Sequence, residues 1–217
     1  MNIGIVAGGP QAALADLAIY TDKVDLWIGA DLGASYLLDQ NITIDIAIGD
    51  FDSIDDNIKN KIKKSTSIYK EYPVEKNETD LELAIETALT YKPDSILLFG
   101  VTAGRLDHEL ANIQLLYRLI DRNTKAVIID CQNEISMYKP GTYQVTTNKN
   151  QQISFLPFSP KVQGLTLKGF YYPLSNETIS WGSTRCISNH LIKQHGTFLF
   201  NLGILIMIKS TEEENLS

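Results

Sequence analysis

The sequence predicts an α/β N-terminal domain with a parallel sheet flanked by helices, followed by an all-β sandwich domain. Over about the first 130 residues, short β-like runs alternate with amphipathic helical patterns, which is typical of a parallel sheet with helices on its faces. From about Glu134 onward no helical pattern recurs, and β-rich runs follow one another between turn residues, as in an antiparallel sandwich or barrel. We therefore expect two domains, residues 1–133 and 134–217.

The N-terminal domain is predicted from short apolar runs that read as strands and from two helices with clear periodicity. The strands are expected at Asn2–Val6, Val24–Ile28, Ile44–Ile48, Ser67–Tyr72, Ser95–Phe99 and Ala126–Ile129. One helix carries the apolar stripe Leu81, Ala84, Ile85 and Ala88, and the other carries Leu106, Leu110, Ile113, Tyr117 and Ile120. Both stripes have the i, i+3, i+4 spacing of an amphipathic helix.

The C-terminal domain is predicted from β-rich runs at nearly regular spacing. These are "TYQVTT", "QQISFLPF", "VQGLTLKGFYY", "ETISWGS", "NHLIKQH", "GTFLFNL" and "GILIMIK". Pro140 and Gly141 are expected to form a turn near the domain boundary, and the tail "TEEENLS" is expected to be frayed.

Composition excludes several classes of protein. A formal charge of −7 with no dense Lys and Arg cluster argues against a nucleic-acid surface. The longest apolar run near the C-terminus, Ile204–Ile208, is too short to cross a membrane, and the N-terminus does not resemble a signal peptide. Cys131 and Cys186 form no CxxC pair, so neither a disulfide framework nor a zinc site is indicated. We expect a cytoplasmic protein.

Acidic residues follow the third predicted strand in "IAIGDFDSIDD". In an extended strand end, Asp50 and Asp52 would project to one face while Phe51 turns toward the core. Two carboxylates so placed repel each other unless a cation lies between them, and Mg²⁺ prefers such hard oxygen ligands. This stretch is therefore a candidate magnesium site.

A solvated loop is the alternative for the same stretch. Ser53 would then N-cap a helix, and Asp55 and Asp56 would interact favourably with the positive end of that helix. We adopt this interpretation for Asp55 and Asp56, and both interpretations stay open for Asp50 and Asp52.

Glycine-containing segments follow other predicted strands. "AGGP" follows the first strand, "GADLGA" the second and "GVTAGRLDH" the fifth. The carboxyl ends of parallel strands form the ligand crevice of open α/β sheets, so these segments should meet. Gly8 and Gly9 would permit close approach of a ligand, and Gly104 could offer its N–H to phosphate, although tight turns also use glycine.

Charged residues accompany these segments. Arg105 could bind a phosphate bidentately, or it could be a surface residue. Asp107 and His108 lie in the first turn of the following helix, where Asp107 could serve only the helix dipole and His108 only packing.

"KNETDLELAI" contains a further set of candidates. Thr79 and Glu82 match a capping box, which alone would explain both residues. Asp80 begins a helix whose N-terminus should face the same crevice, and Lys76 is close enough in sequence to neutralise phosphate charge there.

Taken in order, "AGGP", "GADLGA", "GDFDS", "KNETDLELA", "GRLDHELANI" and "CISN" resemble the thiamine pyrophosphokinase family over nearly the whole chain. The resemblance implies transfer of pyrophosphate from ATP to the hydroxyl of thiamine, giving thiamine diphosphate and AMP with Mg²⁺. Family members more often have glycine at the positions of Leu32 and Ala103, and Glu at that of His190.

The resemblance also implies roles for individual residues. Asp50, Asp52 and Asp80 would be magnesium ligands with Asp31 nearby, and the first three would act in catalysis with Arg105 and Asp107. The residues implied to bind ATP or thiamine are Gly8, Gly9, Asp31, Lys76, Thr79, Gly104, Arg105, His108, Trp181, Ser188 and Asn189.

Trp181 has two interpretations. Its ring could stack on the cationic heterocycle of thiamine, or it could be an inward-facing sandwich residue. The resemblance implies that residues 1–133 bind the nucleotide and magnesium and that residues 134–217 bind thiamine and form the dimer contact. It thus implies a homodimer whose active site is shared between subunits. A magnesium-dependent phosphohydrolase and a non-catalytic thiamine- or nucleotide-binding module stay open as alternatives.

Overall fold

The chain forms two compact units, Met1–Cys131 and Gln132–Ser217, in a computed structural model that describes residues 1–147 and 151–211. The predicted boundary, between residues 133 and 134, lies beside the observed one. The prediction for the tail concerns residues that, apart from Thr211, lie outside the described ones.

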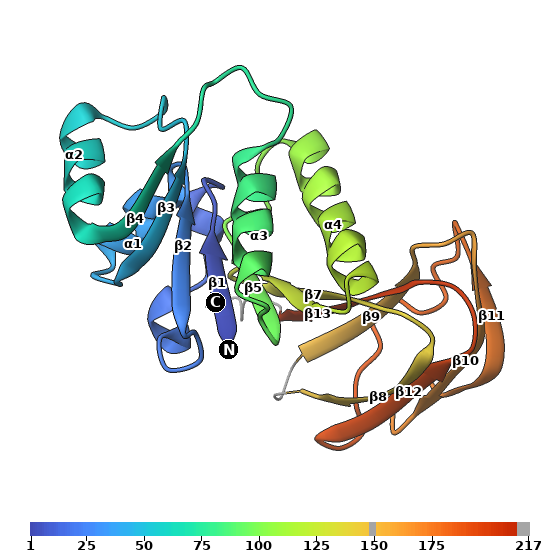
Figure 1. Cartoon of the computed structure of the whole chain (residues 1–217). Coiled ribbons are helices and arrows are strands. Elements are labelled where there is room, and N and C mark those ends of the chain that lie inside the picture. The colour runs from blue at the N-terminus through green and yellow to red at the C-terminus, as the bar shows by residue number, and fades with distance from the viewer. Residues whose placement is uncertain (148–150, 212–217) are drawn as a thin grey trace. The chain divides into compact units, whose positions relative to one another are not determined.

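Six parallel strands form the sheet of the N-terminal unit (Figure 1), in the order β4-β3-β2-β1-β5-β6. They are β1 Asn2–Val6, β2 Leu26–Ala30, β3 Ile44–Gly49, β4 Thr66–Glu71, β5 Ser95–Phe99 and β6 Lys125–Ile129. All the strands predicted for this unit are confirmed, and β2 begins two residues later than expected. The strand order reverses between β1 and β5, which is where sheets of this kind open a ligand crevice.

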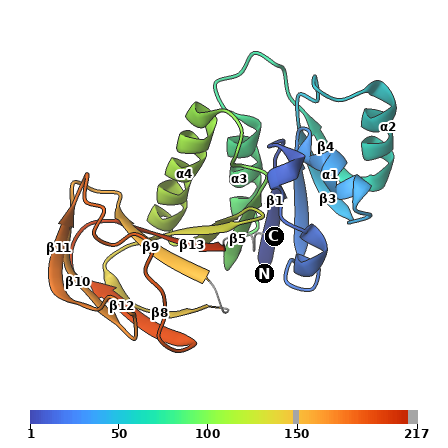
Figure 2. The ribbon, with the colours of Figure 1, turned by 180° about the vertical axis from the view of Figure 1, so that it is seen from behind.

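Helices cover this sheet. They are the 3₁₀ helices η1 Gln11–Ala13 and η2 Leu17–Tyr20, and the α-helices α1 Gly33–Asp39, α2 Asp56–Ser65, α3 Asp80–Thr90 and α4 Leu106–Asp121. One core cluster joins Leu17 of η2, Ala34 and Leu37 of α1, and Ile62 of α2 to strand residues. Helices α3 and α4 lie side by side in the views of Figures 1 and 2, and Arg118 of α4 forms ion pairs with two glutamates of α3. The predicted stripe of α3 is buried.

The predicted stripe of α4 is not the face that this helix buries. Leu106, Leu110 and Tyr117 are exposed, whereas Leu116 and Leu119 are fully buried. A helix with apolar residues on more than one side offers two possible stripes, and periodicity alone does not decide which one packs. The stripe recognised in the sequence is therefore not the buried face of α4.

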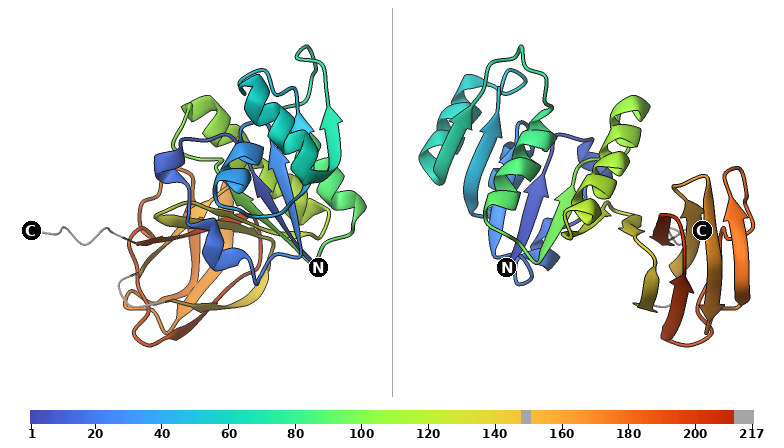
Figure 3. Two further views of the ribbon diagram at one scale, coloured as in Figure 1. Left: turned by 90° about the vertical axis from the view of Figure 1, so that its left-hand side faces the viewer. Right: turned by 45° about the vertical axis from the view of Figure 1, so that its right-hand side comes forward.

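The C-terminal unit contains two antiparallel sheets (Figure 3). One has the order β7-β13-β9 and the other the order β11-β10-β12-β8. Their strands are β7 Asn133–Tyr138, β8 Gly141–Thr146, β9 Gln151–Pro157, β10 Lys161–Lys168, β11 Leu174–Ser180, β12 His195–Phe200 and β13 Leu205–Thr211. A core cluster includes Phe155 and Met207 from the first sheet and Leu165 and Phe198 from the second, and this packing confirms the predicted sandwich.

One local prediction for this unit was wrong, and one strand was missed. The run "NHLIKQH" is not a strand before His195, because Asn189 and Leu191 form only isolated bridges, to Ile153 and Phe170. Strand β7 was not predicted, although it alternates buried Ile135 and Met137 with less buried neighbours. Pro140 lies in the short connection between β7 and β8, as the expected turn requires.

Cys131 is an exposed thiol and Cys186 a buried one, and neither forms a disulfide. Among the described residues, no helix has both the length and the hydropathy needed to span a bilayer.

Candidate functional site

A cleft of about 790 Å³ lies at the carboxyl ends of β1, β2, β3 and β5 of the N-terminal unit. The sequence-predicted residues that line it are Gly8, Gly9, Asp31, Asp50, Lys76, Thr79, Asp80, Gly104, Arg105 and His108. These residues come from five separate segments, which the parallel sheet brings to one edge as the strand-end argument predicts. Asp52 and Asp107 are not among the residues lining the cleft.

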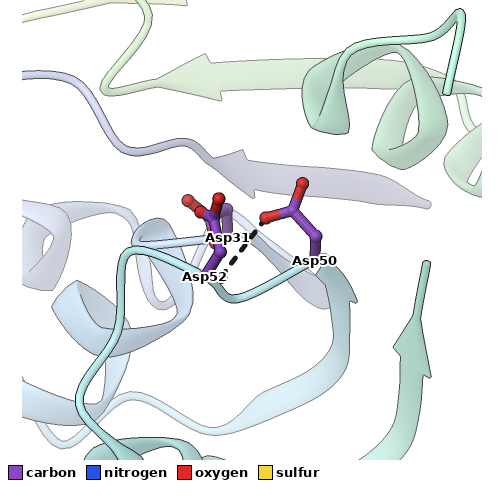
Figure 4. A group of neighbouring side chains, drawn as sticks. All are labelled: Asp31, Asp50 and Asp52. Atoms are coloured by element: carbon purple, nitrogen blue, oxygen red, sulfur yellow. Dashed lines mark hydrogen bonds between the residues drawn. The ribbon is translucent and has the colours of Figure 1, made fainter. Parts of the chain in front are cut away.

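Three carboxylates lie together (Figure 4), and two of them, Asp31 and Asp50, line the cleft. Asp31 follows β2, and Asp50 and Asp52 follow β3. Each can offer one oxygen such that the three oxygens lie within 4.8 Å of one another. Asp31 is therefore a member of the carboxylate group with Asp50 and Asp52, whereas the sequence indicated only that it would lie nearby.

The backbone brings Asp50 and Asp52 together through a turn and not through strand alternation. β3 ends at Gly49, and Phe51 has φ = 55°, in the left-handed region, while its side chain is buried. The Asp52 N–H donates to Asp50 Oδ1 at 3.3 Å. The predicted inward direction of Phe51 is confirmed, but the expected extended conformation was wrong because a tight turn follows the strand.

The alternative role of Ser53 as an N-cap is also corrected. Helix α2 is capped by Asp55, whose carboxylate accepts from the Asn57 N–H, and Asp56 lies in the first turn. The assignment of Asp55 and Asp56 to the helix terminus is thus confirmed. Ser53 Oγ instead donates to Asp31 Oδ2 at 2.7 Å, so Ser53 supports the acidic cluster, a role that the sequence did not indicate.

The cluster fits a divalent cation with oxygen ligands. Asp31 Oδ1 is buried and has no hydrogen-bond partner, which is costly for a carboxylate oxygen unless a cation or water binds it. The negative charge of Asp50 raises the pKa of Asp52, as expected for carboxylates that share a small volume. Mg²⁺ would relieve both the unsatisfied oxygen and the repulsion.

Lys76 connects this cluster to the start of α3. Its Nζ lies 2.8 Å from Asp50 Oδ2 and 3.0 Å from Asp80 Oδ1. The hydrogen bond from Lys76 lowers the pKa of Asp50, whereas burial raises the pKa of Asp80 although Lys76 opposes that change. Burial lowers the pKa of Lys76, but its interactions with the two carboxylates together outweigh burial and raise it.

Helix α3 begins at the cleft with the predicted capping box. Thr79 Oγ1 accepts from the Glu82 N–H at 3.2 Å, and Glu82 Oε2 accepts from the Thr79 N–H at 3.0 Å. Asp80 is the first helical residue, as expected. The cap therefore explains the presence of Thr79 and Glu82, and it also presents Thr79 and Asp80 to the cleft.

The segments after β1 and β5 both line the cleft and touch each other. The Gly9 N–H donates to the Gly100 carbonyl at 2.8 Å, and a Cβ on Gly9 would lie 2.5 Å from that oxygen. Gly9 is thus required for close backbone packing between the two loops. At Gly104 a Cβ would meet only the Pro10 ring, with Cδ at 3.5 Å and Cγ at 4.0 Å, so packing does not demand glycine there.

Two residues of α4 hold the loop after β5. Glu109 Oε2 accepts from the Ala103 N–H at 3.0 Å, and Asn112 Nδ2 donates to the Val101 carbonyl at 2.8 Å. Both residues also line the cleft. The sequence reasoning missed them, although polar residues at helical spacing behind a glycine-containing loop were a usable signal.

Arg105 and Asp107 form an exposed ion pair next to this loop. Arg105 donates from Nη2 to Asp107 Oδ2 at 2.6 Å, and this bond lowers the pKa of Asp107. Arg105 and His108 line the cleft, whereas Asp107 does not. Arg105 is therefore available to an anionic ligand, with Asp107 as its partner in the free chain.

The candidate thiamine residues lie in the C-terminal unit. Asn189 is buried, and both ends of its amide bind backbone groups: Oδ1 accepts from the Tyr172 and His190 N–H groups, and Nδ2 donates to the Tyr172 carbonyl. Ser188 is exposed, with φ = 55°. Trp181 is 63% exposed, which excludes the interpretation of this ring as part of the sandwich core.

Comparison with known proteins gives consistent matches over both units. Residues 17–128 match the family model described as "Thiamin pyrophosphokinase, catalytic domain", and residues 142–205 match "Thiamin pyrophosphokinase, vitamin B1 binding domain". The chain is 51% identical over 212 residues to a thiamine pyrophosphokinase of Bacillus subtilis (strain 168), covering 97% of this chain and 99% of the relative.

Solved structures agree with these matches. A crystal structure of thiamine pyrophosphokinase from Bacillus subtilis superimposes with a TM-score of 0.93 at 50% identity, covering 98% of this chain and 100% of that one. A thiamin pyrophosphokinase from Geobacillus thermodenitrificans has a TM-score of 0.88 at 41% identity, with both chains fully covered.

Proposed function

Because the chain belongs to the thiamin pyrophosphokinase family, we propose that the N-terminal cleft binds ATP with Mg²⁺ and that the C-terminal sandwich binds thiamine. The chain is a thiamine pyrophosphokinase, a transferase that uses ATP as co-substrate. The observation that carries the proposal for the cleft is the group of Asp31, Asp50 and Asp52 with its unsatisfied buried oxygen.

Asp31, Asp50 and Asp52 would hold Mg²⁺, and Asp80 is a further candidate ligand. The cation would supply charge neutralisation to the polyphosphate and to the developing charge during transfer. Ser53 keeps one Asp31 oxygen in place through its hydrogen bond. The partly buried Asp50, whose pKa is lowered by the hydrogen bond from Lys76, stays ionised at neutral pH.

The remaining cleft residues would bind and orient the triphosphate. Gly8 and Gly9 permit close approach of the backbone, and Gly104 precedes the N-terminus of α4. Arg105 can exchange the two oxygens of Asp107 for two oxygens of a phosphate group and so keep its bidentate bonding. His108 and Thr79 line the same cleft. Several groups would thus bind one polyphosphate, and phosphoryl-type transfer needs such positioning but no covalent nucleophile.

The reaction proposed here is attack of the thiamine hydroxyl on the β-phosphorus of ATP, with AMP as the leaving group and the hydroxyl proton passing to a carboxylate or water. Trp181 would stack on the cationic ring of thiamine, because its indole is exposed. Ser188 would contact thiamine directly, whereas Asn189 would position the Tyr172 backbone beside it.

A homodimer with a shared active site is also proposed. The exposed apolar stripe of α4, Leu106, Leu110 and Tyr117, supports it, because exposed apolar helix faces commonly mark protein contacts. A cytoplasmic location is proposed as well, since ATP is the co-substrate.

The products test the reaction. We expect incubation with ATP, Mg²⁺ and thiamine to give AMP and thiamine diphosphate in equal amounts, measured by liquid chromatography and mass spectrometry. ADP with thiamine monophosphate would contradict attack at the β-phosphorus. Release of inorganic phosphate that does not depend on thiamine would indicate the phosphohydrolase alternative.

Isosteric variants test the metal site. Asp31→Asn, Asp50→Asn and Asp52→Asn should each lower kcat on the order of 100-fold while circular dichroism stays unchanged, because each removes a ligand charge with little change in size. Asp56→Asn in α2 is the matched control, since Asp56 lies outside the acidic cluster, and it should keep normal turnover. Wild-type activity in all three variants at saturating Mg²⁺ would refute the assignment.

A further inference from the structure

Lys76 occupies the acidic site in the free chain. Its ammonium group contacts Asp50 and Asp80, and the side chains of Lys76 and Asp50 are each only 11% exposed. Lys76 thus places one positive charge between Asp50 and Asp80, and Asp50 also belongs to the cluster with Asp31 and Asp52. The lysine therefore already supplies part of the charge that a metal ion would bring.

Both oxygens of Asp50 are engaged in this arrangement. Oδ2 accepts from Lys76 Nζ at 2.8 Å, and Oδ1 accepts from the Asp52 N–H at 3.3 Å. A divalent cation bound to Asp50 must share its carboxylate with the ammonium group, and the two positive charges repel each other at this short range. Lys76 thereby opposes metal binding in the absence of nucleotide.

A triphosphate offers Lys76 another partner. The lysine lines the same cleft as Gly9 and Arg105, and its ammonium group is a mobile point charge on a flexible stem that binds phosphate oxygens readily. If the ammonium group of Lys76 moves from Asp50 to a phosphate oxygen of the nucleotide, Asp50 Oδ2 becomes free to bind the metal. Nucleotide and metal then favour each other's binding, as linkage requires.

We propose that Lys76 is a resident countercation that competes with the divalent metal for Asp50 and, by transferring to the triphosphate, couples metal binding to nucleotide binding. This inference rests on the proposed ATP and Mg²⁺ site. In this proposal Lys76 makes tight metal binding depend on bound nucleotide, in addition to neutralising phosphate charge.

The test is Mn²⁺ binding without turnover. Mn²⁺ prefers similar oxygen ligands and can be followed by electron paramagnetic resonance. Lys76→Met removes the ammonium group and keeps an unbranched stem. Lys61→Met, at an exposed position of α2, makes the same change in net charge away from the cleft. Without nucleotide, Lys76→Met should bind Mn²⁺ at least about tenfold more tightly than wild type, and Lys61→Met should stay within about twofold.

The same titrations with α,β-methylene ATP measure the coupling. The analogue should tighten Mn²⁺ binding in the wild type by a larger factor than in Lys76→Met. The intrinsic affinity of Mn²⁺ for the analogue is common to all variants, so the ratio between variants isolates the lysine. Lys76→Gln, which can still donate to Asp50 but carries no charge, should resemble Lys76→Met if charge is the cause.

Two results separate the inference from the site on which it rests. Unchanged or weaker Mn²⁺ binding by both Lys76→Met and Lys76→Gln without nucleotide would overturn the role of Lys76. If Asp52→Asn failed to weaken Mn²⁺ binding in any state, the proposed metal site itself would be wrong.

Discussion

Single residues with unusual backbone conformations shape the site. Asp31, Phe51 and Ala103 all have positive φ, at 48°, 55° and 61°. Such conformations are strained for residues with a Cβ and persist only where surrounding structure imposes them. At Phe51 the strained turn brings Asp50 beside Asp52. At Ala103 it presents the N–H to Glu109.

Ala103 is the residue at which this strain can be measured. Ala103→Gly should raise the free energy of unfolding by roughly 0.5–1 kcal/mol, because glycine adopts positive φ without a steric penalty and this gain exceeds its entropic cost. Urea denaturation measures the difference.

Ala111→Gly is the matched control for that substitution. Ala111 is exposed in the middle of α4, where glycine should lower stability by about 1 kcal/mol. The same chemical change should therefore have opposite signs at the two positions. A loss of stability at both would show that Ala103 is not strained.

At the scale of elements, two helices begin near the acidic site with different caps. Asp55 caps α2 through the Asn57 N–H, and Thr79 caps α3 through a capping box. Only Thr79 also lines the cleft. Removal of the Asp55 cap should therefore affect helix stability alone, whereas removal of the Thr79 cap should affect both helix stability and ligand binding.

Alanine variants of the caps test this separation. Asp55→Ala and Thr79→Ala should each lower the free energy of unfolding by about 1 kcal/mol, because each leaves a helical N–H without its acceptor. Asp55→Ala should keep the wild-type KM for ATP, whereas Thr79→Ala should raise it. Equal KM values for both variants in steady-state assays would limit Thr79 to capping.

Element positions were predicted better than element orientations. The carboxyl ends of β1, β3 and β5 carry the residues that the sequence singled out, because alternation of strands and helices is a local signal. The orientation of α4 was not predicted, because Leu110 and Leu116 are equally apolar and only packing distinguishes them.

At the scale of the whole molecule, the exposed stripe of α4 predicts association. If a second copy covers it, Leu110→Glu should convert a dimer to a monomer, because a buried unpaired charge is costly. Ile19→Glu is the control, since Ile19 is also an exposed apolar residue but lies in η2 outside the stripe. Sedimentation velocity distinguishes the two outcomes. A dimer that survives Leu110→Glu would place the contact elsewhere.

The sequence by itself determined the class of fold, the succession of strands and the residues gathered at the strand ends. These features depend on periodicity and on the rule that parallel strands end at one edge, both of which are visible in a linear pattern.

Tertiary structure alone decided which contacts those residues make and which of them are exposed. It brought Asp31 to Asp50 and Asp52, connected Lys76 to two carboxylates and assigned Asn189 to the Tyr172 backbone. It also left Trp181 exposed. These outcomes depend on left-handed turns and on contacts between distant segments, whose energies no local pattern contains.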